Sequence, residues 1–217
     1  MKGLLTKDLI FMRTQWRFIF IYLLLILLFL ITNTAPSFIL GYCTLFFTIL
    51  VMSTTGYDEA NNGNSFLFTL PFSRGLYVAE KYLFGFCMGL LGWGIAVAFV
   101  LAQTAFFDPS ADLLDMGADS LPWLLMVPIF LSLILPINLR FGSEKGRYAA
   151  MILFALSILS VYLFRQASEA FHLPVADIAN AFLRHRELTA AGATALAFVL
   201  FFFSYCVSRH IIAKKQF

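Results

Sequence analysis

The chain is 217 residues long; 61% of its residues are hydrophobic and only 12% are charged. A water-soluble domain is nearer half apolar and a quarter charged, and a fold of this length has too little interior to bury the excess. The net charge of +3 does not indicate nucleic-acid binding, because the basic residues lie singly or in small groups at the ends of apolar runs. The composition therefore predicts an integral membrane protein.

Six apolar runs are long enough to cross a bilayer, whose hydrocarbon core of about 30 Å requires roughly 20 residues per helix. Helices are expected because backbone groups must be satisfied without water, and the runs lack the alternating polarity of a membrane barrel. The predicted spans are Arg17–Thr34, Pro36–Thr55, Tyr82–Phe107, Leu121–Leu139, Tyr148–Phe164 and Leu188–Ser208. We therefore predict an all-α, polytopic membrane protein with six transmembrane helices in one domain that covers residues 1–217.

Residues 1–16, before the first span, are predicted to form an amphipathic helix at the membrane interface. Its apolar face is defined by positions i, i+4, i+7 and i+11, which are Leu5, Leu9, Met12 and Trp16. Trp16 is then expected at the depth of the lipid headgroups. A plain basic flank of the first span is the alternative.

The connection between the second and third spans, residues 56–81, begins polar and Asn-rich and then turns apolar and aromatic. Pro71 marks a break, and Ser73 is placed to cap a helix that begins at Arg74. Exposed aromatic residues in such a connection are unfavourable unless something covers them. The cover is expected to be the chain's own helices, the membrane surface or a partner protein.

Residues within the third and fourth spans predict particular helix contacts and bends. Gly85, Gly89 and Gly92 follow one another at i, i+4 and i+7 in the third span, which favours close approach of a second helix. Pro128 and Pro136 each remove a backbone hydrogen bond from the fourth span, so we expect kinks there.

Residues 165–187, between the fifth and sixth spans, are predicted to form a short amphipathic segment at the outer membrane interface. Its apolar residues recur at helical spacing, interrupted by Pro174: Phe171, Val175, Ile178 and Phe182.

The distribution of Lys and Arg predicts the orientation of the chain, because basic residues accumulate in cytoplasmic loops. Of the 15 basic residues, the side that holds both termini collects 12: Lys2, Lys7, Arg13, Arg17, Arg74, Lys81, Arg140, Lys145, Arg147, Arg209, Lys214 and Lys215. The opposite side has only Arg165, Arg184 and Arg186. We therefore predict a multi-pass protein of the cell membrane with both termini in the cytoplasm.

The sequence lacks the motifs of an enzyme. It has no phosphate-binding Gly-x-x-x-x-Gly-Lys-Ser/Thr loop, no His-Glu-x-x-His zinc pair and no Gly-x-Ser-x-Gly nucleophile elbow. The apolar runs contain essentially no ionisable residues, which argues against an ion-coupled pump. We therefore expect no catalytic, cofactor-binding or metal-binding residues, and energy for any transport from another chain.

Four features together resemble the short permease subunits of ABC type-2 exporters, whose ATPase is a separate polypeptide. The start Lys2–Leu9 looks like the interfacial helix of that family. The segments Tyr57–Glu59, Leu70–Arg74 and Ala79–Tyr82 are similar to its first cytoplasmic loop. Six spans with both termini inside and the outer amphipathic segment complete the resemblance.

The resemblance implies a pathway formed by two permease protomers, identical or related, above two ATPase subunits that bind ATP and Mg. The first cytoplasmic loop would couple the ATPase to the spans, through Asp58, Glu59, Phe66, Phe68, Leu70, Pro71, Phe72, Ser73 and Arg74. This chain is then not itself an enzyme and has no nucleic-acid partner. The alternatives are a non-transporting membrane scaffold or immunity protein and an intramembrane enzyme. The substrate stays open.

Overall fold

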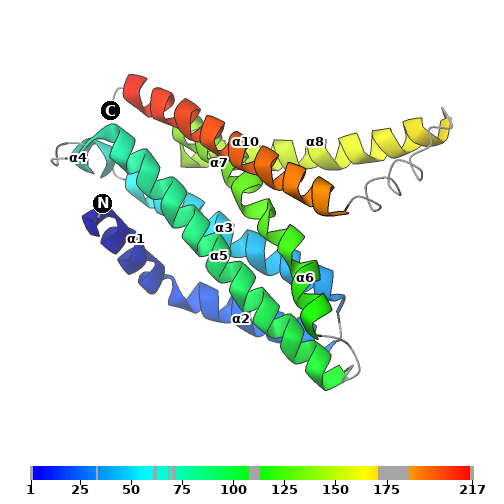
Figure 1. The fold of residues 1–217 in the computed structure, drawn as a ribbon. Helices are drawn as coiled ribbons and strands as arrows, with labels where there is room; N and C mark the ends of the chain where they lie inside the picture. The colour runs from blue at the N-terminus through cyan, green and yellow to red at the C-terminus, as the bar shows by residue number, and fades with distance from the viewer. Residues whose placement is uncertain are drawn as a thin grey trace.

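The structure is a computed structural model that describes residues 2–32, 34–60, 63–67, 69, 72–107, 113–170 and 186–215. Every regular element within these residues is a helix (Figure 1). The helices are α1 (Lys2–Thr14), α2 (Trp16–Ile31), α3 (Pro36–Glu59), α4 (Gly63–Leu67), α5 (Arg74–Phe107), α6 (Leu113–Leu124), α7 (Met126–Phe141), α8 (Ser143–Ala170) and α10 (Arg186–Lys214). The prediction of an all-α protein is confirmed.

Four helical segments of the described chain are long and apolar enough to cross a membrane. They are Pro36–Glu59, Arg74–Phe107, Asp119–Phe141 and Leu188–Lys214. The pair formed by α1 and α2, bent by 64° at their junction, raises the number to five when it is taken as one span. A multi-pass membrane protein is therefore confirmed, whereas the count of six spans stays a prediction. Of the segment 165–187 that is predicted for the outer interface, residues 165–170 continue α8, Arg186 begins α10, and residues 171–185 lie outside the described part of the chain.

The centre of the bundle is the pair α3 and α5, against which α7 packs (Figure 1). The glycines of α5 allow this close packing. A Cβ atom at Gly85 would lie 2.7 Å from Leu131 Cδ2, and one at Gly89 would lie 2.4 Å from Val127 Cγ1, both on α7. A Cβ at Gly92 would lie 2.6 Å from Cβ of Phe47 on α3. Any larger side chain at these three positions would therefore push the helices apart.

The predicted fourth span is broken into α6 and α7 at Leu125, between Pro122 and Pro128. Pro136, further along α7, has no N–H, so the carbonyl of Ser132 loses its usual helical donor. The hydroxyl of Ser204 on α10 donates a hydrogen bond to this carbonyl at 2.6 Å. The proline in α7 is thus compensated from the neighbouring helix, as is common within membranes.

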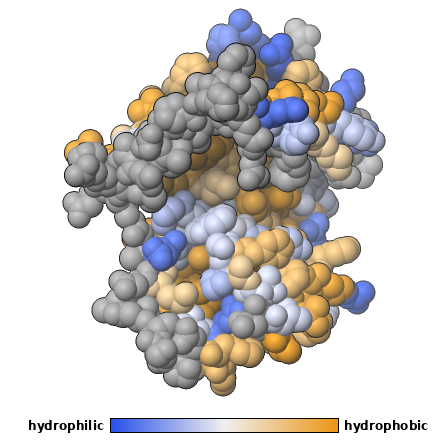
Figure 2. All heavy atoms as spheres, turned by 90° about the vertical axis from the view of Figure 1, so that its right-hand side faces the viewer, coloured by the Kyte–Doolittle hydropathy of each residue, from blue (hydrophilic) through white to orange (hydrophobic). Residues whose placement is uncertain are grey.

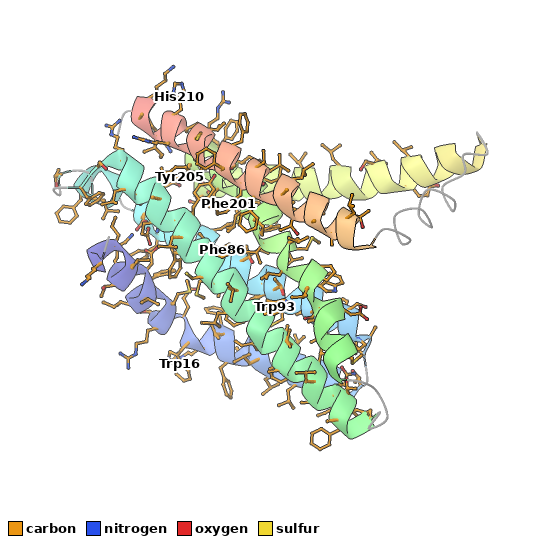
Figure 3. All side chains as sticks on the ribbon, viewed as in Figure 1. Trp16, Phe86, Trp93, Phe201, Tyr205 and His210 are labelled. Carbon is orange, nitrogen blue, oxygen red and sulfur yellow. The ribbon has the colours of Figure 1, made fainter. Side chains whose placement is uncertain are left out.

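Within the described residues, the last helix, α10, is buried more along its second half than along its first. Its buried residues include Ser204, Ser208 and Ile212, whereas Ala197 is the one buried side chain among the described residues from Leu188 to Phe203. Tyr82 of α5 shares hydrogen bonds with the hydroxyls of Ser204 at 2.6 Å and Ser208 at 2.8 Å. Figure 3 shows the aromatic side chains of Phe86 and Phe201 between the same two helices.

Much of the remaining surface is apolar. Figure 2 faces the right-hand side of Figure 1 and shows hydrophobic residues gathered at several places among polar ones. Leu188, Val199 and Phe202 are 77%, 68% and 67% exposed. Such a surface requires lipid or a protein partner, because in water it would drive aggregation.

Candidate functional site

A network of buried charges joins three helices at the end of the bundle where α1 begins and α10 ends (Figure 1). We call this end the terminal end. The ammonium group of Lys81, which is 0% exposed, lies 2.5 Å from Asp8 Oδ2 and 2.8 Å from Asp58 Oδ2. It also donates a hydrogen bond to the hydroxyl of Thr54 at 3.1 Å. Lys7 forms a second bridge, since its ammonium contacts Asp58 and lies 3.1 Å from Asp8 Oδ1.

The three charges come from three different helices. Asp8 is on the inward face of α1, Asp58 is in the last turn of α3, and Lys81 is near the start of α5. The 34 residues of α5 extend about 51 Å at about 1.5 Å per residue, well beyond a hydrocarbon core of about 30 Å. The turns before the predicted span at Tyr82 therefore have room to project from the membrane and to carry charge.

The network carries a desolvation cost, because its charged groups are buried away from water. Burial alone would raise the pKa of Asp8, but the ammonium groups of Lys81 and Lys7 together lower it, so this carboxyl stays ionised at neutral pH. Removing one partner of a buried ion pair costs about 3–5 kcal/mol, because the other charge is then left uncompensated. Separating the three helices would break these buried ion pairs and is therefore unfavourable.

Two further side chains of α5 complete the cluster. Tyr77, one turn before Lys81, donates a hydrogen bond to Asp58 Oδ2 at 3.1 Å. Glu80 is 0% exposed, and its carboxylate lies 3.8 Å from the ammonium of Lys81. Among the described residues its two oxygens have no hydrogen-bond partner. Lys81 is therefore surrounded by three carboxylates, of which Glu80 is the least well compensated.

A second polar set at the terminal end holds α10 and α8. The guanidinium of Arg74 donates hydrogen bonds to the carbonyls of Ile212, Ala213 and Lys215 at 3.2, 2.9 and 3.0 Å. A cation at this position satisfies carbonyls that a helix end leaves unpaired and complements the helix dipole. Arg74 therefore fixes the end of α10 to the start of α5.

Glu59 performs the matching function for α3 and α8. Its carboxylate accepts a hydrogen bond from the backbone N–H of Ser143 at 2.5 Å, at the first residue of α8. The same carboxylate lies 3.5 Å from the ammonium of Lys215, which donates to the carbonyl of Leu139 at 3.0 Å. The ends of five helices are thus linked by side chains on one face of the molecule.

The chain is similar to one known protein family over nearly its whole length. The model of the family described as ABC-2 family transporter protein matches residues 3–213. The chain belongs to the ABC-2 transporter family. Neither a protein of curated function nor a solved structure matches it. The resemblance to ABC type-2 permeases is confirmed, and the chain is a membrane permease component of this class.

In this ABC-2 chain the predicted coupling residues occupy several environments. Ser73 caps α5 as predicted, since its hydroxyl accepts a hydrogen bond from the N–H of Leu76 at 3.2 Å. Phe66 of α4 is 68% exposed, whereas Phe72 is partly buried against the core. Asp58, Glu59 and Arg74 bind other parts of the same chain. Phe68, Leu70 and Pro71 lie outside the described residues.

The connection itself is shorter than the predicted range 56–81. Residues up to Glu59 continue α3, and α5 has begun by Arg74. The sequence places a break at Pro71 and a cap at Ser73, but the helical extension of α3 past Thr55 is not visible in hydropathy, because the last turn of that helix is polar.

The segment predicted to be an interfacial helix is helical as α1, which ends at Thr14, and Trp16 already belongs to α2. Its location at the membrane interface stays a prediction. Leu9 is 58% and Trp16 59% exposed, and Figure 3 shows Trp16 projecting away from the bundle. Met12 is buried and Leu5 is half-buried. The predicted apolar face is thus divided: Leu9 and Trp16 are exposed, whereas Leu5 and Met12 pack against the bundle.

Asp8, Tyr77 and Glu80 belong to the network but are not among the predicted site residues, although Asp8 and Glu80 lie within the segments Lys2–Leu9 and Ala79–Tyr82 that carry the resemblance. A signal for Asp8 is present, since it follows Leu4 and precedes Met12 at intervals of four, and all three are buried. A carboxylate in line with two buried apolar residues requires a cation from elsewhere in the fold. The sequence does not say which cation.

Proposed function

We propose that this chain is the transmembrane permease subunit of an ATP-driven exporter with six spans and both termini in the cytoplasm. A separate ATPase, which binds ATP and Mg, docks at the terminal end, and a second permease protomer, identical or related, completes the pathway. The chain supplies no catalytic residue, cofactor or metal site of its own. Membership of the ABC-2 family and several membrane-spanning helices support this proposal.

The observation that carries the coupling proposal is Lys81 between Asp8 and Asp58. Because this one ammonium group binds carboxylates from α1 and α3 while belonging to α5, a push on any of the three helices is transmitted to the other two. The contact surface for the ATPase is the tip of the connection between α3 and α5, where Phe66 is exposed. An exposed aromatic side chain beside a polar network is the kind of anchor that a partner's pocket takes.

The proposal is tested by removing this anchor. We expect Phe66→Ala to leave the chain folded and inserted, because the side chain contributes little to the core, but to weaken association with the ATPase at least tenfold. The measurement is titration of the purified chain, in lipid nanodiscs, with the ATPase that is encoded beside it. Phe106→Ala is the matched control, since Phe106 is 80% exposed at the opposite end of α5.

Equal binding of the ATPase to the Phe66→Ala variant and to the unaltered chain would contradict the docking surface. Failure of the unaltered chain to bind any ATPase would instead favour a non-transporting membrane scaffold.

A further inference from the structure

A hollow of about 870 Å³ separates the first half of α10 from α6 and the start of α7. Phe86 of α5, Leu121 of α6 and Pro128 of α7 line one side of it, and the segment from Thr189 to Phe198 of α10 lines the other. It lies on the side of the molecule that Figure 2 faces, away from the terminal end. The hollow is separate from the charge network and is not used by the coupling proposal.

Among the described residues, no charged side chain lines the hollow. Thr194 is one of its two hydroxyl-bearing residues, and this hydroxyl already donates to the carbonyl of Ala190 at 2.7 Å. The α10 side is made of small residues, among them Ala190, Gly192 and Ala193. Small residues usually bring membrane helices into contact, but here α10 packs closely only along its second half. The small side chains of α10 therefore leave the hollow open instead of bringing α10 into contact with α6.

The dimensions of the hollow match one leaflet of a bilayer. From Thr189 to Phe198, α10 rises about 14 Å at about 1.5 Å per residue. Half of a hydrocarbon core of about 30 Å is about 15 Å, which is the depth that one lipid tail occupies. The volume is within the range of about 300–1,000 Å³ that is typical of small-molecule sites. A rod-like apolar group fits this length, and a charged one does not fit the lining.

We propose that this hollow is a binding site for the acyl chain of a membrane phospholipid. The acyl chain enters the hollow from the side, between α6 and α10, and the phospholipid headgroup remains at the membrane surface. The apolar walls supply affinity through burial of hydrocarbon, at about 25 cal/mol per Å². This site goes beyond the proposed transport function, because it requires neither the ATPase nor a second protomer.

The test uses the full chain, purified in detergent, with a phosphatidylcholine that carries a photoreactive diazirine in one acyl chain. We expect labelling to saturate and to fall on peptides that contain Leu121–Pro128 and Thr189–Phe198. Gly192→Leu should reduce this labelling at least tenfold, because its side chain occupies the hollow. Gly94→Leu is the matched control. An added Cβ meets no atom within 4 Å at either glycine, so both variants are compatible with the fold.

Ala193→Leu, a second substitution in the lining, keeps the test decisive if Gly192→Leu is recovered in low yield. Unchanged labelling in both lining variants, or labelling that rises without saturation over all the helices, would overturn the proposal. So would a change in oligomeric state on filling the hollow without loss of labelling, since the occupant would then be a second copy of the chain. Binding of the ATPase, measured separately, reports on the proposed transport function alone.

Discussion

Lys81 is a lysine that is completely removed from solvent, and its surroundings explain how that is possible. A lysine that lacks partners is expelled from a protein interior or loses its proton. Here Asp8 and Asp58 lie within 2.8 Å and the hydroxyl of Thr54 adds a third acceptor. The residue therefore satisfies its three N–H donors within one chain, and each donor binds a different helix or helix turn.

We expect Lys81→Met to be strongly destabilising. The substitution preserves the volume of the side-chain stem, but it leaves the buried carboxylates of Asp8, Asp58 and Glu80 without the ammonium group that they share. The expected cost is about 3–5 kcal/mol. The measurement is the midpoint temperature of unfolding of the purified chain in detergent. Lys145→Met, which alters an exposed lysine at the start of α8, should stay within about 0.5 kcal/mol of the unaltered chain.

The double variant Asp58→Asn with Lys81→Met separates charge from packing. If the charge is responsible, neutralising one of these carboxylates recovers part of the lost stability, and a double-mutant cycle gives a coupling energy. Simple additivity of the two substitutions would show that the buried pair is not the source of the effect.

At the scale of the helices, local sequence explains most of what is observed. The apolar runs predict α2, α3, α5, α7, α8 and α10, and Ser73 predicts the start of α5. The prolines predict an interruption in the fourth span, which the structure places at Leu125. These features depend on residues close together in the chain, so hydropathy and capping preferences are sufficient to find them.

The charge network was not predictable in the same way, because its pairs are distant in sequence. Lys81 and Asp8 are 73 residues apart, and Lys7 and Asp58 are 51 residues apart. Lys7 and Lys81 are two of the twelve basic residues from which the cytoplasmic side is predicted. That prediction depends only on their positive charge and on their position in the sequence. Whether such a lysine faces lipid headgroups or a buried carboxylate depends on how α1 folds back against α3 and α5.

The contact between α5 and α7 provides a prediction about helix packing. We expect Gly89→Ala to destabilise the chain by about 1–3 kcal/mol, since the new Cβ would lie 2.4 Å from Val127 Cγ1 and 2.9 Å from Thr48 Oγ1. Val127→Ala in the same chain removes the closest clash and should restore much of the loss. The unfolding midpoint in detergent measures both effects.

Gly94→Ala is the control for this packing prediction, because nothing lies within 4 Å of an added Cβ at that position of the same helix. A Gly89→Ala variant as stable as Gly94→Ala would mean that α5 and α7 are further apart than the structure shows.

The whole molecule consists of two groups of helices with different attachments. The charge network ties α1, α3 and the start of α5 together, while the hydrogen bonds that join α10 to α5 and α7 lie in its second half. The hydroxyls of Tyr82, Ser204 and Ser208 form a polar link between α5 and α10 within the apolar region. Under the proposed function, a movement that the ATPase imposes on the first group would reach α10 through this link, through Arg74 and through the contact between Glu59 and Lys215.

Tyr82→Phe tests the link with the smallest available change. The ring remains packed against Phe201 and Tyr205, whose centroids lie 5.2 and 5.6 Å away, so only the hydroxyl contacts are lost. We expect a stability loss of about 0.5–1.5 kcal/mol, normal binding of the ATPase, and fewer substrate molecules moved per ATP hydrolysed in proteoliposomes. Tyr162→Phe, at a tyrosine of α8 that is 62% exposed, should leave this ratio unchanged. If Tyr82→Phe leaves the number of substrate molecules moved per ATP unchanged, movement passes between the two groups of helices through other residues. Arg74 is then the next residue to replace.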